Sequence, residues 1–136
     1  MKLFELKSPA EVRQLEVELD KLMRSVGLDV EFSRHFVERL LGRDRSITGQ
    51  EIIASFDKLK RKYKQKLLKY KKTPGQRAIL KDFDSELNVI FGVQASRNKD
   101  KLPELVNITI MRKDPDKFRT DTPSGSGEEL KVGTRR

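Results

Sequence analysis

The stretch RAILKDFDSELNVIFGV, residues 77–93, decides the fold class of this chain. Two short apolar runs, Arg77 to Phe83 and Leu87 to Val93, flank the tight turn Asp84-Ser85-Glu86, a pattern typical of a β-hairpin. A third run, Leu105 to Lys113, follows the longer polar connection 94–104. The sequence therefore predicts three strands that form an antiparallel sheet.

The apolar residues before the hairpin recur at the spacing of an α-helix. Ser8-Pro9-Ala10-Glu11 provides a hydroxyl cap, a proline at the first helical position and a glutamate three residues after the cap. Apolar residues then recur every three or four positions until Gly27. A second helix is expected from Ser33 to about Leu41, and a third from the capping box Thr48-Gly49-Gln50-Glu51 to about Lys72. Three helices followed by a three-stranded antiparallel sheet indicate an α+β fold.

The chain is expected to divide into three segments. Residues 1–28 form an N-terminal amphipathic helix, residues 29–113 an α+β core domain, and residues 114–136 an extended, flexible C-terminal tail. The tail loses hydrophobicity, and its Ser124-Gly125-Ser126-Gly127 has the composition of a flexible linker. The N-terminal helix either covers the core or meets a partner helix.

Residues 58–72, KLKRKYKQKLLKYKK, form what we call the cationic segment. Nine of its fifteen residues are lysine or arginine and none is acidic. The chain has 30 basic and 21 acidic residues, so this segment accounts for the whole net charge of +9 and the remainder is balanced at 21 against 21. Such a charge density attracts a polyanion, with nucleic acid as the first expectation. A solvated surface and a contact for an acidic protein are the alternatives.

The cations expected to contact a nucleic-acid backbone come from the cationic segment and from the second helix. They are Arg34, Arg43, Lys58, Lys60, Arg61, Lys62, Lys64, Lys69, Lys71 and Lys72. The apolar residues of the third helix share one narrow arc of its surface, which ties it to the core: Ile52, Phe56, Leu59, Tyr63, Leu67 and Tyr70. Leu68 is the one apolar residue among the cations of the opposite face.

The composition restricts the available chemistry. The chain has no cysteine, which removes disulfides, thiol nucleophiles and thiolate metal sites, and it has a single histidine, His35. No apolar run approaches the roughly 20 residues of a membrane span, and the first residues lack the apolar region of a signal peptide. We expect a cytoplasmic protein with no membrane contact, no metal and no small-molecule cofactor.

His35 is predicted to lie in the first turn of the second helix, where free backbone N–H groups favour anions. His35, Arg39 and Arg43 are spaced by four residues and share one stripe of that helix. The helix dipole favours the neutral imidazole, which can accept a proton from a ribose hydroxyl. The alternative is a surface or half-buried histidine that caps a carbonyl group, with Arg39 paired to Glu38 or to an aspartate of the next loop.

Arg112 is a second candidate, at the end of the last predicted strand. Strict alternation places it on the helix-covered face together with three apolar residues, Val106, Ile108 and Ile110. An arginine directed at that face needs a carboxylate or a bound phosphate as its partner. Lys81 has a similar position in the first strand of the hairpin. The structural alternative is a buried ion pair with Asp82 or Asp57.

Three stretches carry a resemblance to a known family: FSRHFVER at 32–39, ITGQEI at 47–52 and TIMRK at 109–113. Over about residues 30–120 the chain resembles an uncharacterised family of small proteins from large tailed bacteriophages. The shared features are a His-x-x-x-Arg helix, a helix opened by Ile-Thr, a strand with Lys81-Asp82 and a closing Met-Arg-Lys. This resemblance implies no known activity.

More distantly, a His-x-x-x-Arg helix followed by a second helix and an antiparallel sheet is similar to the RelE and BrnT group of small ribonucleases. That group includes a phage enzyme that cleaves early messenger RNA, and its members cut RNA without a metal, with the ribose hydroxyl as nucleophile. The resemblance implies that His35 acts as base and that Arg39 and Arg112 contact the phosphate. This chain lacks the second histidine of the phage enzyme's pattern, so the proton for the leaving oxygen would come from water or a lysine.

The leading hypothesis is therefore a phage-type nucleic-acid-binding protein of the host cytoplasm that prefers RNA and acts as a metal-independent endoribonuclease through His35, Arg39 and Arg112. The alternative is a non-enzymatic phage component. It would be either a nucleic-acid-binding accessory protein or a virion or assembly protein. In that case the N-terminal helix and the C-terminal tail contact a phage or host protein.

Overall fold

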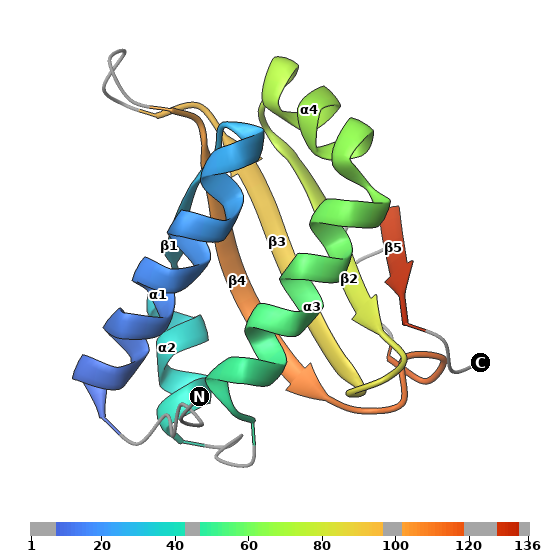
Figure 1. Ribbon diagram of the computed structural model, residues 1–136. Helices are drawn as coiled ribbons and strands as arrows, with labels where there is room; N and C mark the ends of the chain where they lie inside the picture. The colour runs from blue at the N-terminus through green and yellow to red at the C-terminus, as the bar shows by residue number, and fades with distance from the viewer. Residues whose placement is uncertain (1–7, 43–46, 97–101, 119–127, 134–136) are drawn as a thin grey trace.

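The computed structural model describes residues 8–42, 47–96, 102–118 and 128–133, and it has an α+β fold (Figure 1). This confirms the predicted fold class. The elements in chain order are α1 (Pro9–Met23), a 3-10 turn (Arg24–Val26), β1 (Asp29–Phe32), α2 (Arg34–Leu41), α3 (Gly49–Lys62), α4 (Lys64–Lys72), β2 (Gln76–Asp82), β3 (Leu87–Gln94), β4 (Glu104–Arg112) and β5 (Glu128–Val132).

The sheet is mixed, and the prediction of three antiparallel strands was wrong in two respects. The antiparallel β2–β3–β4 unit is present at the predicted positions, but β1 pairs in parallel with β4, and β5 pairs in parallel with β2. The five strands lie in the order β1-β4-β3-β2-β5. The short turn of a β-hairpin can be recognised in the sequence. Two parallel strands are joined by a long connection, so local sequence does not indicate that they pair.

The C-terminal segment was expected to be a flexible tail, and part of it is a strand instead. Residues 128–132 form β5, in which Leu130 and Val132 are buried while Glu128 and Glu129 are exposed. The short strand has only two apolar positions, which is too weak a pattern to identify it from sequence. Ser124-Gly125-Ser126-Gly127 lies outside the described residues.

The predicted third helix is divided at Tyr63 into α3 and α4. Tyr63 has φ −119° and ψ 30°, outside the helical range. Its hydroxyl donates to the carbonyl of Lys131 (3.0 Å) and accepts from the N–H of the same residue (3.1 Å), so it binds the backbone of the edge strand β5. The sequence has no glycine or proline at this position, and the division accompanies a tertiary contact that local sequence does not encode.

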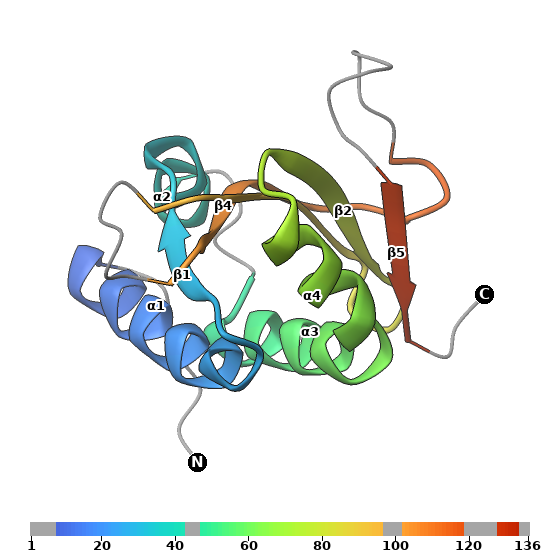
Figure 2. The same cartoon turned by 90° about the horizontal axis from the view of Figure 1, so that it is seen from above.

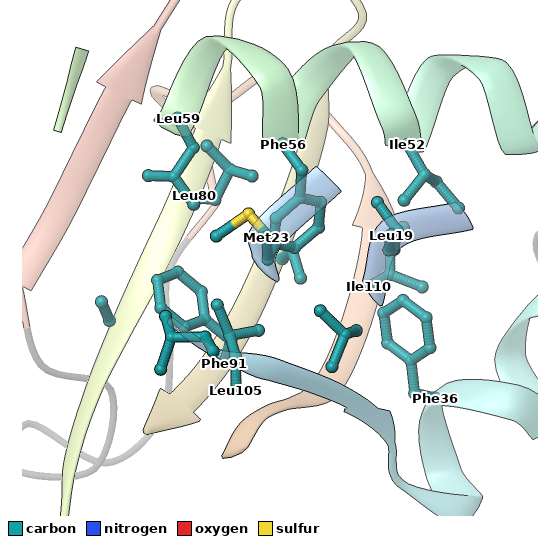
Figure 3. Close-up of a cluster of buried hydrophobic side chains, with 14 of the residues drawn as sticks. Leu19, Met23, Phe36, Ile52, Phe56, Leu59, Leu80, Phe91, Leu105 and Ile110 are labelled. Atoms are coloured by element: carbon teal, nitrogen blue, oxygen red, sulfur yellow. The ribbon is translucent and has the colours of Figure 1, made fainter. Parts of the chain in front are cut away.

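Helices α1, α3 and α4 cover one face of the sheet, and α2 flanks the β1–β4 side (Figures 1 and 2). Apolar side chains from both layers meet between them, as Figure 3 shows for Leu19 and Met23 of α1, Phe36 of α2, Phe56 of α3 and Phe91 of β3. The predicted caps begin these helices. Ser8, Ser33 and Thr48 each accept a hydrogen bond from the N–H three residues later, and Glu51 completes the capping box.

A β-bulge in β4 changes which side chains face the helices. Ile90 pairs with Thr109 but Phe91 pairs with Asn107, so Ile108 is an extra residue in β4. Arg112 therefore shares a face with Ile110, as predicted, but with Leu105 and Asn107 in place of Val106 and Ile108. Asn107 is fully buried on that face, and neither its Oδ1 nor its Nδ2 has a hydrogen-bond partner among the described residues.

Acidic side chains of α1 bind the outer edge of the sheet. Glu16 Oε2 accepts from the N–H of Phe32 (2.8 Å), and Asp20 Oδ1 accepts from the N–H of Val30 (2.9 Å). The N–H groups of Val30 and Phe32 on edge strand β1 are thereby satisfied within the molecule, and Tyr63 satisfies one N–H of β5, that of Lys131, at the other edge. The N-terminal helix thus covers the core and also closes an edge of the sheet.

Candidate nucleic-acid interface

The cationic segment has two parts with different environments, and the part before Tyr63 is held by protein oxygens. Lys58 Nζ lies 3.0 Å from Asp82 Oδ2 and 3.0 Å from Asp84 Oδ2. The other three cations of α3 each bind a protein oxygen: Lys60 binds the carbonyl of Leu22 (3.5 Å), Arg61 binds Asp57 (2.5 Å) and Lys62 binds the carbonyl of Lys131 (2.9 Å). Lys62 Nζ also lies over the Tyr63 ring, 5.4 Å from its centroid. Lys58, Lys60, Arg61 and Lys62 were predicted to contact nucleic acid, and each of them has an acceptor within the protein.

The Lys58 contact centres on a buried carboxylate. Asp82 is fully buried and also accepts from Ser55 Oγ (2.5 Å) and from the N–H of Asp84 (2.9 Å). Partial burial acts to lower the pKa of Lys58, but its hydrogen bonds to Asp82 and Asp84 outweigh that effect and raise the pKa. Lys58 is therefore the counter-ion that makes the burial of Asp82 possible.

Glu128 of β5 occupies one side of α4. It accepts from Lys66 Nζ (2.8 Å) and from the hydroxyl of Tyr70 (2.5 Å). The hydrogen bond from Lys66, followed by that from Tyr70, lowers the pKa of Glu128, while burial and the neighbouring carboxylate raise the pKa of Tyr70. Lys66 and Tyr70 thus bind β5 to α4.

Four lysines of α4 have neither a hydrogen bond nor an ion pair with any residue that the structure describes: Lys64, Lys69, Lys71 and Lys72. At 100° per residue they fall with Gln65 and Leu68 on an arc of about 160°, which we call the α4 face. Of these four, Lys69 lies near enough to Glu128 to help lower the pKa of that carboxyl group. Helix α4 contains no acidic residue, so the α4 face is a continuous cationic surface.

The α4 face borders a hollow of about 430 Å³. The described residues that line it are Gln65, Leu68, Lys69, Lys71, Lys72 and, from across the gap, Pro103. Both walls are anchored. The carbonyl of Pro103 accepts from the N–H of Asp29 (3.0 Å), and Lys71 lies so close to the turn at Gly27 (φ 76°) that a Cβ at position 27 would clash with its Nζ.

The opposite charge gathers on the far side of Pro103. Glu16, Asp20, Asp29, Glu31 and Glu104 line a second hollow, of about 320 Å³, at β1, together with a single cation, Arg24, which pairs with Asp20 (3.0 Å). Partial burial, followed by repulsion from Glu16, Glu104 and the two aspartates, raises the pKa of Glu31. A polyanion on the α4 face therefore meets repulsion beyond Pro103.

His35 is exposed in the first turn of α2, as predicted. Helix α2 lies away from α4 in both views of the molecule (Figures 1 and 2). Arg34, next to His35, is also exposed and lies 3.6 Å from Glu38. Arg43 lies outside the described residues. His35 and Arg34 thus belong to a different part of the surface from the α4 face.

Arg39 and Arg112 lie near the same end of β4, and both bind protein oxygens. Arg39 Nε donates to the carbonyl of Ile110 (2.6 Å), beyond the end of β1. Arg112 donates to Glu51 (2.6 Å) and to the carbonyl of Ser85 (2.8 Å). Burial acts to raise the pKa of Glu51, but hydrogen bonds from Arg112 and Thr48 outweigh it and lower the pKa. The observed contacts of both arginines hold helices against the sheet.

Lys81 also differs from its expected position. It is 2% exposed, and its Nζ binds Glu129 (2.8 Å) together with the carbonyls of Pro115 (3.0 Å) and Phe118 (3.3 Å). Its neighbours in β2 have their side chains on the helix-covered face, so Lys81 points to the opposite face, under residues 115–118. Side chains alternate between the two faces of a strand, so Lys81 and Asp82 point to opposite faces of the sheet, and Lys81 pairs with Glu129 of β5 instead of Asp82 or Asp57.

The candidate residues that sequence reasoning missed are Gln65 and Pro103, which complete the hollow beside α4. Pro103 is 31 residues or more from α4 in the chain, so only the tertiary fold brings it there. Leu68 was visible as the isolated apolar residue of a cationic face, and that is the one signal that could have indicated a binding surface.

Comparisons with family models, curated proteins and solved structures found no match to this chain. In the part of the chain that the structure describes, no helix has the length and apolar character needed to cross a membrane. The described histidine and carboxylate side chains include no group of three arranged to hold a metal ion.

Proposed function

We propose that this chain is a nucleic-acid-binding protein that holds backbone phosphates on the α4 face. The observation that carries the proposal is that Lys64, Lys69, Lys71 and Lys72 have no acceptor among the described residues, while the other cations of the cationic segment do. Ammonium groups at this density repel one another, and phosphates would relieve that repulsion with release of counterions.

A phosphate backbone fits the dimensions of this surface. Residues 64–72 span about 12 Å along the helix axis, enough for a few successive phosphates of one strand. The four lysines come from one rigid element, so they can hold those phosphates together. The repulsive acidic hollow at β1 confines the polyanion to the α4 side of Pro103. We take RNA as the favoured nucleic acid, in line with the sequence resemblance.

The test is fluorescence anisotropy with a labelled short single-stranded RNA at several salt concentrations. The variant Lys64→Gln/Lys69→Gln/Lys72→Gln is expected to bind more weakly and to lower the slope of log K against log salt by about 2, at roughly 0.7 per phosphate contact. The matched control changes three exposed lysines elsewhere, Lys21, Lys113 and Lys117, to glutamine. Equal affinities and slopes for the two triple variants would exclude the α4 face as the binding surface.

Metal-independent RNA cleavage is the second candidate function, favoured by the exposure of His35 one helical turn before Arg39. Incubation of the pure protein with RNA in EDTA tests it. Cleavage that His35→Ala abolishes and that Arg34→Gln leaves unchanged supports a base at His35. Intact RNA, or cutting that survives His35→Ala, rejects catalysis and leaves the binding proposal unaffected.

A further inference from the structure

We propose that the hollow between α4 and Pro103 seats one unpaired nucleotide of a single strand. Its base would rest between Leu68 and Pro103, and its flanking phosphates would lie on Lys69, Lys71 and Lys72. This inference deepens the proposed function and rests on it. It adds a prediction that phosphate binding alone does not make: the protein distinguishes single strands from duplexes.

The apolar part of the lining carries the argument. Phosphates and ribose offer little apolar surface, so a site that bound the backbone alone would have no use for a leucine among four lysines. Leu68 is half-buried within the α4 face, and Pro103 faces the same hollow. The faces of a nucleobase are flat and apolar, and they gain free energy when they leave water for such a surface.

The size of the hollow limits its occupant. About 430 Å³ lies toward the lower end of the range for small-ligand sites, roughly 300–1,000 Å³, so the hollow suits a nucleotide and is too small for a base pair with its two backbones. In a duplex each base is paired and stacked, so no base is free to enter. An unpaired base can turn out of its strand at little cost.

Charge sets the orientation of the nucleotide. The lysines lie on the α4 side of the hollow, and Glu104, next to Pro103, belongs to the acidic group at β1. A phosphate directed at Pro103 would approach these carboxylates, whereas a base directed there brings no charge to them. Phosphates therefore stay on α4 and the base turns inward, where the amide of Gln65 can donate to or accept from its edge.

The walls are held in place before any ligand arrives. Pro103 is fixed where β4 begins to pair with β1, through its carbonyl and the N–H of Asp29. Lys71 is half-buried and packed against Gly27, so less side-chain entropy is lost when it binds a phosphate than for a fully exposed lysine. A preformed site of this kind binds with little reorganisation.

The experiment compares three probes by anisotropy: a single-stranded RNA, the matching duplex, and a single strand of equal length with abasic residues. The variant Leu68→Ser is expected to weaken binding of the intact single strand about three- to tenfold, with an unchanged salt slope, and to leave the other two probes unaffected. Val17→Ser removes an apolar side chain that is 43% exposed on α1, and it serves as the control. Pro103→Ser tests the opposite wall and should give the same pattern.

The outcomes separate this inference from the proposed function. Binding that requires the α4 lysines, but is equal for single strand, duplex and abasic strand and insensitive to both serine variants, overturns the nucleotide seat and leaves the proposed function standing. No binding of any probe at low salt overturns both. Thermal unfolding of each variant shows whether a loss of binding results from a loss of folded structure. If Leu68→Ser does not fold, binding by Pro103→Ser tests the nucleotide site in its place.

Discussion

Arg112 and Glu51 form an ion pair that fixes the end of β4 to the first turn of α3, with Nη2 2.6 Å from Oε1. The same Glu51 oxygen accepts from the N–H of Thr48 (3.0 Å), so one carboxylate closes the capping box and binds the sheet. The two side chains are 27% and 33% exposed, so solvent screens the pair only in part. The pair joins the helical layer to the sheet where β4 ends and α3 begins, two element ends that lie at the bottom of Figure 1.

Replacing Arg112 with methionine is expected to lower the free energy of unfolding by about 1 kcal/mol, after allowance for the partial exposure of the pair. The reason is that Glu51 and the carbonyl of Ser85 lose their charged donor. Urea unfolding measures the change, and Lys113→Met, at an exposed neighbour, is the control. A variant of unchanged stability that has lost RNA binding or cleavage would instead place Arg112 in a functional site.

Acid is expected to weaken the contacts of Glu51 and Glu128. The folded protein lowers the pKa of both carboxyl groups from their ordinary 4.5, so their contributions to stability are full above that pH and are lost as the pH falls through the lower, folded values. Thermal unfolding between about pH 7 and pH 3 should show this decline, reduced in Glu51→Gln/Glu128→Gln. An identical pH profile for the variant and the parent would contradict it.

Glu31 is expected to act in the opposite direction. Its pKa is raised, by partial burial and by four neighbouring carboxylates, so it destabilises the fold where it is ionised and stops doing so as it is protonated. Glu31→Gln should therefore raise the melting temperature at neutral pH and have little effect in acid. Glu38→Gln is the control, because Glu38 is exposed and lies beside Arg34.

Asn107→Leu is expected to stabilise the protein by about 1 kcal/mol, because a buried amide without partners carries an uncompensated desolvation cost. Chemical unfolding of the variant and the parent measures the difference. Asn88 of β3 provides the contrast: its Oδ1 also lacks a partner among the described residues, but its Nδ2 donates to three carbonyls, including that of Lys113 (2.9 Å), so Asn88→Leu should be destabilising. Destabilisation by both substitutions would show that Asn107 is hydrogen-bonded in solution.

Asp20→Ala/Glu16→Ala is expected to promote aggregation, because it uncovers the N–H groups of Val30 and Phe32 on edge strand β1. Light scattering during incubation below the melting temperature measures the effect. Glu18→Ala, which changes the same helix without touching β1, is the control. If the double variant stays as dispersed as this control, the two carboxylates have no protective role.

The parts of the fold that depend on neighbouring residues were predictable from sequence. The caps at Ser8, Ser33 and Thr48 and the hairpin around Asp84-Ser85-Glu86 form where they were expected. These signals act over three or four residues, so no knowledge of the rest of the chain is needed. The division at Tyr63 depends instead on β5, and the register of Arg112 depends on a single extra residue in β4, so neither could be read from local patterns.

For the candidate site, sequence identified the cationic segment but not which of its cations are available. Arg61 pairs with Asp57 four residues earlier, a local contact that could have been anticipated. Lys58 and Lys66 pair with Asp82 and Glu128, which lie on strands far along the chain. Pairing with distant carboxylates neutralises some of the cations that sequence counts as available to bind a polyanion. The tertiary structure is needed to identify which cations these are.

The division of the cationic segment at Tyr63 has a consequence for how the sequence of this protein can evolve. Substitutions in α4 at Lys64, Lys69 or Lys72 alter the affinity for a polyanion with little effect on folding, because no described residue depends on them. A substitution of Lys58, before the break, alters folding first, because Lys58 is the counter-ion of the buried Asp82. Ligand preference can therefore drift within one short helix while the rest of the molecule stays under selection for stability.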